Sequence, residues 1–262
     1  VAARLTTAPD ATREFAAQLD KLPTSAQTLL INALADRGDS TALAAVTSAV
    51  SSSEPAISLA AVNALGAIGN ATSVPQLAEL AAKGDAEIQS TARASLAEMR
   101  GEDVDSAIAA SIDKGDATVR RELARALGSR RTKSAIPALL LAAADADSSV
   151  RAEGFASLAA IAPADQLKPI VELLAIEQDD IARAEGEKAA LAVLSRNNDP
   201  AFAAATVMSA LPDVKQGIPA YCSILRVAGK IDDPTAYDAL VGAAELKNTD
   251  VRTTAVRALS AC

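Results

Sequence analysis

The feature that most constrains the fold is an internal repeat with a step of 31 residues. Four segments share one pattern, EPAISLAAVNALG, DAEIQSTARASLA, DATVRRELARALG and DSSVRAEGFASLA, which start at residues 54, 85, 116 and 147. A β-branched anchor opens the apolar stripe of each copy, and a Leu follows eight positions later; the anchors are Ile57, Ile88, Val119 and Val150. Self-similarity at such a period indicates units that bury their apolar faces against neighbouring units.

Less regular copies extend the register to both ends of the chain, with anchors at Ala26, Ile181, Ala220 and Val251. The step from Ile181 to Ala220 is 39 residues, which is eight more than the period. We therefore expect an irregular unit and an insertion within 181–219, with the extra residues in the loop LPDVKQGIP at 211–219. Insertions in repeat proteins map to loops, and this one is either a functional loop or a neutral surface insertion.

Each copy predicts two helices joined by short turns. Polar residues that suit an N-cap stand three positions before the anchors, namely Asp85, Asp116, Asp147 and Asn248. Gly66 and Gly128 suit a helix that ends or packs closely there. An earlier helix in each unit carries a proline near its first turn, at Pro75, Pro137, Pro169 and Pro234. The predicted fold is all-α, a right-handed α-α superhelix (α-solenoid) of about eight helical hairpins in a single domain over 1–262.

The motif D-x-x-V-R followed by A-L-G, seen best at Asp116–Gly128, closely resembles HEAT repeats, specifically the short bacterial kind named after phycobilisome lyases. The resemblance covers nearly the whole chain. It implies that the second helix of each unit lines an inner, concave face, and it says little about function because such repeats serve many roles. Resemblance to arrays in large bacterial multidomain proteins favours a location outside the cytoplasm. We also expect the sequence to be a piece of a longer protein.

Composition argues against most kinds of catalytic site. The chain has no His, and its two Cys, Cys222 and Cys262, form no Cys-x-x-Cys motif. No phosphate-binding glycine loop or nucleophile elbow occurs in the sequence. We therefore expect no catalytic, cofactor-binding or metal-binding residue and no enzyme activity. A net charge of −8 and the lack of a long apolar segment argue against nucleic acid and against membrane insertion.

These observations favour a non-catalytic scaffold that binds a protein partner, or another domain of its own chain, on the surface of a curved helical array. One alternative is a chromophore (bilin) lyase-like enzyme, which the resemblance to phycobilisome lyase repeats implies. Another is a structural spacer between domains of a large bacterial protein. We expect a monomer in solution, although exposed ends of the array would allow stacking.

The run VRRELARALGSRRTK (119–133) is the most basic part of this acidic chain. It is either a patch that binds an acidic segment of a partner or a solvated helix face. Arg120, Arg151 and Arg252, which follow their anchors, favour a structural Asp/Arg ladder between units. The candidate partner-binding residues are Arg120, Arg121, Arg125, Arg130, Arg131, Arg183, Tyr221, Arg226 and Arg257.

Overall fold

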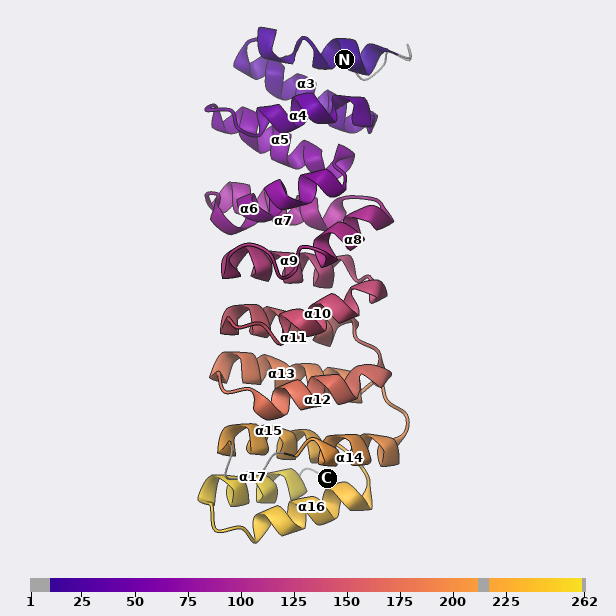
Figure 1. Ribbon diagram of the computed structural model, residues 1–262, viewed down its shortest axis with the longest axis vertical. Helices are drawn as coiled ribbons and strands as arrows, with labels where there is room; N and C mark the ends of the chain where they lie inside the picture. The colour runs from indigo at the N-terminus through magenta and orange to yellow at the C-terminus, as the bar shows by residue number, and fades with distance from the viewer. Residues whose placement is uncertain (1–9, 212–216, 261–262) are drawn as a thin grey trace. The chain divides into compact units, whose positions relative to one another are not determined.

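The computed structural model describes residues 10–211 and 217–260. Within these residues every regular element is helical, and sixteen α-helices follow one another as eight pairs (Figure 1). Five short 3-10 turns join them, η1 (Leu19–Lys21), η2 (Ser40–Ala42), η3 (Ala71–Ser73), η4 (Lys133–Ala135) and η5 (Ala164–Gln166). The predicted all-α fold built from about eight helical hairpins is confirmed.

The chain divides into two compact units that meet in sequence at Arg130 and Arg131. The first holds the pairs α2 (Ala11–Ala16) and α3 (Thr24–Arg37), α4 (Leu43–Ala49) and α5 (Pro55–Ile68), α6 (Val74–Lys83) and α7 (Ala86–Glu98), α8 (Glu102–Ala109) and α9 (Ala117–Arg130). The second holds α10 (Ile136–Ala142) and α11 (Ser148–Ile161), α12 (Leu167–Ile176) and α13 (Asp180–Leu194), α14 (Pro200–Ser209) and α15 (Ile218–Ala228), α16 (Pro234–Ala244) and α17 (Thr249–Leu259). One continuous domain over 1–262 stays a prediction.

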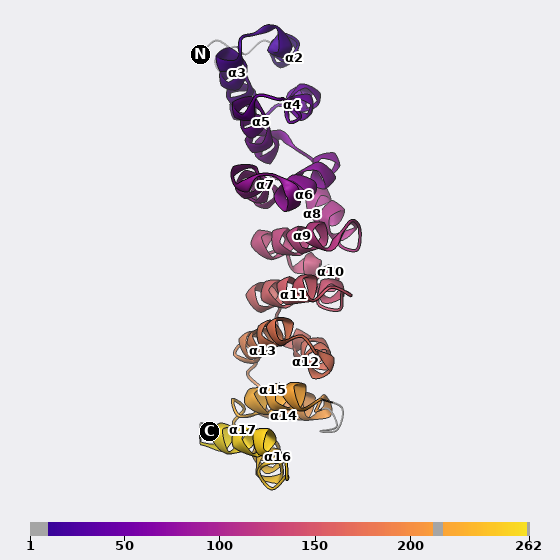
Figure 2. The same ribbon diagram turned by 90° about the vertical axis from the view of Figure 1, so that its left-hand side faces the viewer.

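Each unit is built from two layers of helices. The second helices of successive pairs contact each other, α3 with α5, α7 and α9 in the first unit and α11 with α13, α15 and α17 in the second, each with its neighbour. The first helices lie on the other side, as Figure 2 shows most clearly at α4 and α5 and at α12 and α13. Residues four positions after the anchor are buried in seven of the eight pairs, which confirms the helical register there; they are Leu30, Ala61, Ala92, Leu123, Gly154, Ile224 and Ala255. In α13 the buried residue is Gly186, five positions after Ile181.

The register of α13 differs from the prediction at one point. The expected anchor Ile181 is 70% exposed, and its neighbour Ala182 is buried instead. Phe155 explains the shift, because this fully buried aromatic ring lies 3.3 Å from the place where a Cβ atom at Gly186 would stand. The bulky side chain on α11 therefore needs a glycine opposite it, and advancing the register of α13 by one residue provides it.

The predicted N-caps are confirmed. The side chains of Asp85, Asp116, Asp147 and Asn248 each accept a hydrogen bond from a backbone N–H in the first turn of their helix. Gly66 and Gly128 lie within α5 and α9 and not at their ends, so the glycines do not end these helices. Close packing, the other part of the prediction, is seen at Gly66. A Cβ atom at Gly66 would lie 3.1 Å from the Cα atom of Ser95 on the next pair.

The predicted insertion falls between the two helices of one pair. Helix α14 ends at Ser209 and α15 begins at Ile218, so the first turn of α15 takes up the last two residues of the predicted loop. Residues 212–216 of that loop lie outside the described residues.

A buried ion pair ties α11 to the residues that precede α13. Arg151 donates from Nε and Nη2 to the two carboxylate oxygens of Glu177, at 2.6 and 2.9 Å. Burial raises the pKa of Glu177, but the hydrogen bonds from Arg151 and from the N–H of Asp179 outweigh burial, and the pKa lies below its ordinary value. The contact of Arg151 with the following pair thus uses Glu177, an acid that the predicted Asp/Arg ladder did not include.

We expect glycine substitutions to separate close packing from helix propensity. A Cβ atom at Gly154 would lie 2.5 Å from the backbone nitrogen of Ala143, so Gly154→Ala should lower the free energy of unfolding by about 1–3 kcal/mol. Gly242 on α16 faces open space, and Gly242→Ala should raise the same quantity by up to about 1 kcal/mol. Urea denaturation followed by circular dichroism measures both. Equal stability of the two variants would contradict the packing described.

We expect the Arg151–Glu177 pair to stabilise the protein in a pH-dependent way. Because the folded-state pKa of Glu177 is lowered, its contribution is fully present above 4.5, the ordinary pKa, and is lost as pH falls through the folded-state pKa. The stability difference between wild type and Glu177→Gln should therefore be largest near neutral pH and shrink in acid. Glu172→Gln, whose exposed carboxylate lies 3.9 Å from Lys168, should change little. A Glu177→Gln difference that is constant with pH would refute this.

Candidate interaction surface

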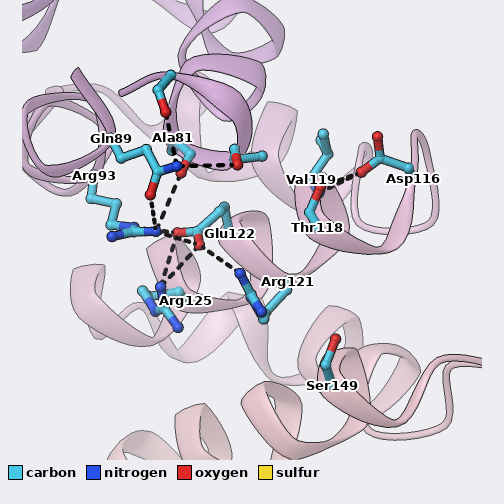
Figure 3. Close-up of polar contacts among 12 residues, drawn as sticks. Ala81, Gln89, Arg93, Asp116, Thr118, Val119, Arg121, Glu122, Arg125 and Ser149 are labelled. Carbon is cyan, nitrogen blue, oxygen red and sulfur yellow. Dashed lines mark hydrogen bonds and ion pairs between the residues drawn. The ribbon is translucent and has the colours of Figure 1, made fainter. Parts of the chain in front are cut away.

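A buried carboxylate surrounded by arginines lies on the second-helix layer of the first unit (Figure 3). Glu122 of α9 has a fully buried side chain, and three guanidinium groups surround it. Arg93 of α7 donates from Nε to Oε2 at 2.7 Å and from Nη2 to Oε1 at 2.9 Å. Arg125 donates from Nη1 to both oxygens, at 2.9 and 3.1 Å. A carboxylate removed from water needs such partners, and these four bonds supply them.

Arg121 is the third cation of the cluster and differs from the other two. Its Nη2 lies 3.6 Å from Oε1 of Glu122, which is beyond hydrogen-bonding distance. Its Nε is buried and has no hydrogen-bond partner among the described residues. Arg93 and Arg125 therefore satisfy Glu122 with hydrogen bonds, while Arg121 approaches it only as an ion pair and its buried Nε is unbonded among the described residues.

The cluster carries three positive charges and one negative charge in a chain whose net charge is −8. A guanidinium presents a planar fork of N–H donors that matches the two oxygens of a carboxylate. The side chain of Arg121 is 33% exposed, so a carboxylate from outside can reach it. This arrangement suits the binding of an anionic group.

The structure places the other predicted arginines of the first unit in structural contacts. Arg120 donates from Nη1 to the carbonyl of Gly115 at 2.8 Å. The prediction that Arg130 belongs to a partner-binding surface is corrected, because its side chain is only 8% exposed. It pairs with Asp105 and donates from Nη1 to the carbonyl oxygens of Leu96 and Met99 at the end of α7, so it serves the fold and not an open surface.

An exposed ion pair joins neighbouring helical pairs at the start of α9. Lys83 Nζ lies 2.8 Å from Oδ2 of Asp116 and 2.7 Å from Oε2 of Glu79. The hydrogen bond to Lys83 holds the pKa of Asp116 well below its ordinary value, and the same bond raises the pKa of Lys83. The acid of the predicted ladder at this turn thus pairs with a lysine of the preceding pair.

In the second unit the structure brings two of the predicted residues together and separates the others. Arg226 and Arg257 line one cavity of about 240 Å³ on the second-helix layer, with Glu187, Lys230 and Leu191 among its other walls. Arg226 donates from Nε to both oxygens of Glu187, at 2.8 and 2.9 Å.

The remaining predicted residues lie elsewhere. Arg183 pairs with Asp180 and donates to the carbonyl of Gln178 at the start of α13. Arg131 is exposed and has a positive φ of 54° in the turn that opens the second unit. The prediction that Tyr221 belongs to a partner-binding surface is also corrected, because its side chain is buried within α15 and does not face solvent. Burial raises the pKa of its phenol. Cys222 beside it is also buried, as expected for a structural cysteine.

Sequence reasoning missed the acceptors and donors that cross from one pair to the next. Arg93 stands five positions after its anchor and Glu122 three positions after the next anchor, so their separation is 29 residues. Glu187 and Arg226 are 39 residues apart, which is the irregular step itself. A search of the sequence for opposite charges separated by about one period would therefore have found both ion pairs.

No group of three or more His, Cys, Asp or Glu side chains able to hold a metal ion occurs among residues 10–211 and 217–260. In the same part of the chain, none of the helices combines the length and the apolar character that crossing a bilayer requires.

Comparison with known families identifies the repeat. A family model of HEAT repeats matches residues 12–97 and 104–190, which together are more than half of the chain. The chain belongs to the HEAT repeat family. A HEAT repeat chain of this kind is a helical repeat scaffold. The resemblance expected from the D-x-x-V-R motif is confirmed.

No curated protein sequence matches this HEAT repeat chain. Among solved structures, human deoxyhypusine hydroxylase in complex with glycerol is similar at 15% identity and a TM-score of 0.34, over 99% of this chain and 86% of that one. The archaeal HEAT-like repeats protein from Thermococcus onnurineus NA1 is similar at 16% identity and a TM-score of 0.39, over 97% of this chain and 98% of that one. Scores this low carry no inference about function.

Arg93 and Arg121 offer a matched test of the cluster, because their side chains are 35% and 33% exposed and both approach Glu122. Arg93→Gln should lower the free energy of unfolding by about 2–3 kcal/mol, since it removes a two-bond partner from a buried carboxylate. Arg121→Gln should change it by less than about 0.5 kcal/mol. Urea denaturation at neutral pH measures both. Similar losses in the two variants would show that Arg121 is as much a structural partner of Glu122 as Arg93.

Proposed function

We propose that this HEAT repeat chain is a non-catalytic protein-binding scaffold that takes an acidic segment of a protein partner, or of another domain of its own chain, on the second-helix layer of the first unit. Arg121 is the observation that carries the proposal. Its guanidinium is held beside a carboxylate that is already satisfied by Arg93 and Arg125, and its buried Nε has no hydrogen-bond partner among the described residues. A second carboxylate, supplied by the partner, would complete the cluster.

The surroundings of the cluster support selective binding. Glu122 removes one of the three positive charges but fixes the positions of Arg93 and Arg125 on two neighbouring helices, α7 and α9. The negative charge of the rest of the chain would repel acidic segments that do not reach the cluster, so charge provides specificity as well as attraction.

We expect Arg121→Glu to weaken binding of a partner while leaving the fold intact. The immobilised chain is used for affinity capture from a lysate of the source organism, and proteins that depend on Arg121 are identified by mass spectrometry. The captured protein is then produced and its affinity measured directly. Reversal of one charge in a charge-assisted contact should weaken binding at least about tenfold, and binding by the wild type should weaken as salt rises.

Arg13→Glu is the matched control for this experiment. Arg13 lies on the first-helix layer of the same unit, is 75% exposed and stands 3.8 Å from Asp10. It gives the same change in net charge without touching the cluster, so it should bind the partner as the wild type does. If Arg121→Glu and Arg13→Glu retain the same partner with the same affinity, the cluster stabilises the fold and does not bind the partner. A chain that captures no partner at all would act only as a spacer.

A further inference from the structure

A cavity of about 240 Å³ lies on the second-helix layer of the second unit, between α13, α15 and α17. These helices follow one another on one side of the unit (Figure 2), and successive ones contact each other. Gly229, which follows α15, and Ala258 of α17 both line the cavity, and a Cβ atom at Gly229 would lie 2.7 Å from the Cβ atom of Ala258. These small residues therefore let the two helices approach closely beside the cavity.

Positive charge dominates the wall of this cavity. The cations that line it are Arg226, Lys230 and Arg257, and the acid that lines it is Glu187. Arg226 donates from Nε to both oxygens of Glu187, at 2.8 and 2.9 Å, so these two residues offset each other's charge. Asp232, two positions after Lys230, lines the neighbouring cavities and not this one. Lys230 and Arg257 thus give the wall two more positive than negative charges, in a chain whose net charge is −8.

A phosphate monoester group matches this wall in charge and in size. At neutral pH such a group carries about −1.5 to −2 charges and three acceptor oxygens. Guanidinium and ammonium groups both bind phosphate, and the hydroxyl of Thr254 adds a further polar group to the cavity wall. The cavity is smaller than the roughly 300–1,000 Å³ typical of small-molecule sites, so it suits one small anionic group. A carboxylate has a single charge and two oxygens, and it matches the excess positive charge less well.

We propose that the cavity between α13, α15 and α17 binds a phosphate monoester group, and that Lys230 and Arg257 supply the positive charge that holds it. Glu187 keeps Arg226 at the cavity wall and neutralises it. The phosphate belongs either to a free ester or to a phosphorylated side chain of a protein, because both carry the same dianionic group. This site belongs to the second unit and the Arg121 cluster belongs to the first, so either can hold without the other.

Isothermal titration calorimetry at low salt tests the site with two phosphate probes, methyl phosphate and a Gly-phosphoserine-Gly peptide with blocked termini. Tighter binding of methyl phosphate would identify a free ester as the ligand, and tighter binding of the peptide would identify a phosphorylated protein segment. Lys230→Gln and Arg257→Gln should each weaken binding of the preferred probe at least about tenfold. A blocked peptide with Glu in place of phosphoserine should also bind at least about tenfold more weakly than the phosphoserine peptide.

Arg252→Gln is the matched control, because Arg252 is exposed on the same helix as Arg257 and does not line the cavity. It removes the same charge and should bind the preferred probe as the wild type does, and so should Arg121→Gln in the first unit. Circular dichroism should show every variant folded, since Lys230, Arg252 and Arg257 are exposed. The proposal is overturned if the wild type binds neither phosphate probe, if Arg252→Gln loses as much affinity as Arg257→Gln, or if the Glu peptide binds as tightly as the phosphoserine peptide.

Discussion

The structure depends on one constraint: a helical pair of this size can bury its apolar face only against its neighbours in sequence. The repeat meets the constraint with two positions on each second helix, one that faces the preceding pair and one that faces the following pair. Apolar residues fill the position that faces the following pair on most second helices, as Val62 and Leu225 do. Phe155 and Gly186 show how closely the two sides fit, because the register of α13 advances by one residue to place a glycine against the ring.

Polar residues at these same positions create the chemistry of the surface. Glu122 puts a carboxylate where other pairs bury Ala60 or Ser223, and a buried charge is tolerated only with close partners. Arg93 and Arg125 are those partners, and Arg121 lies beside them with a buried Nε that has no hydrogen-bond partner among the described residues. Because the buried carboxylate of Glu122 needs close cationic partners, a positively charged cluster forms on an otherwise acidic protein. Function in a repeat scaffold arises from such local departures from the repeat pattern.

The regular part of the fold follows from the sequence, and the departures from the repeat do not. The 31-residue step and the N-caps at Asp85 and Asp147 locate most of the second helices, because backbone capping and apolar periodicity are local properties. The exposure of Ile181 was not predictable in this way, since it depends on the volume of Phe155 in the preceding pair. Tyr221 and Arg130 were assigned to a surface by helix position, but neighbouring helices bury both side chains. The candidate site was found as a basic run, whereas its central carboxylate and its strongest partner, Arg93, become apparent only when two pairs are placed side by side.

Arg93 and Glu122 join neighbouring pairs through a direct contact, and this contact holds the cluster in place. A double-mutant cycle with Arg93→Met and Glu122→Met measures that contact by comparing the free energies of unfolding of the two single variants, the double variant and the wild type. The structure predicts a coupling energy of about 1.5–3 kcal/mol, because each single variant leaves a charged group without its partner and the double variant removes both. Losses that simply add, with a coupling energy near zero, would contradict the arrangement of the cluster and with it the role assigned to Arg121.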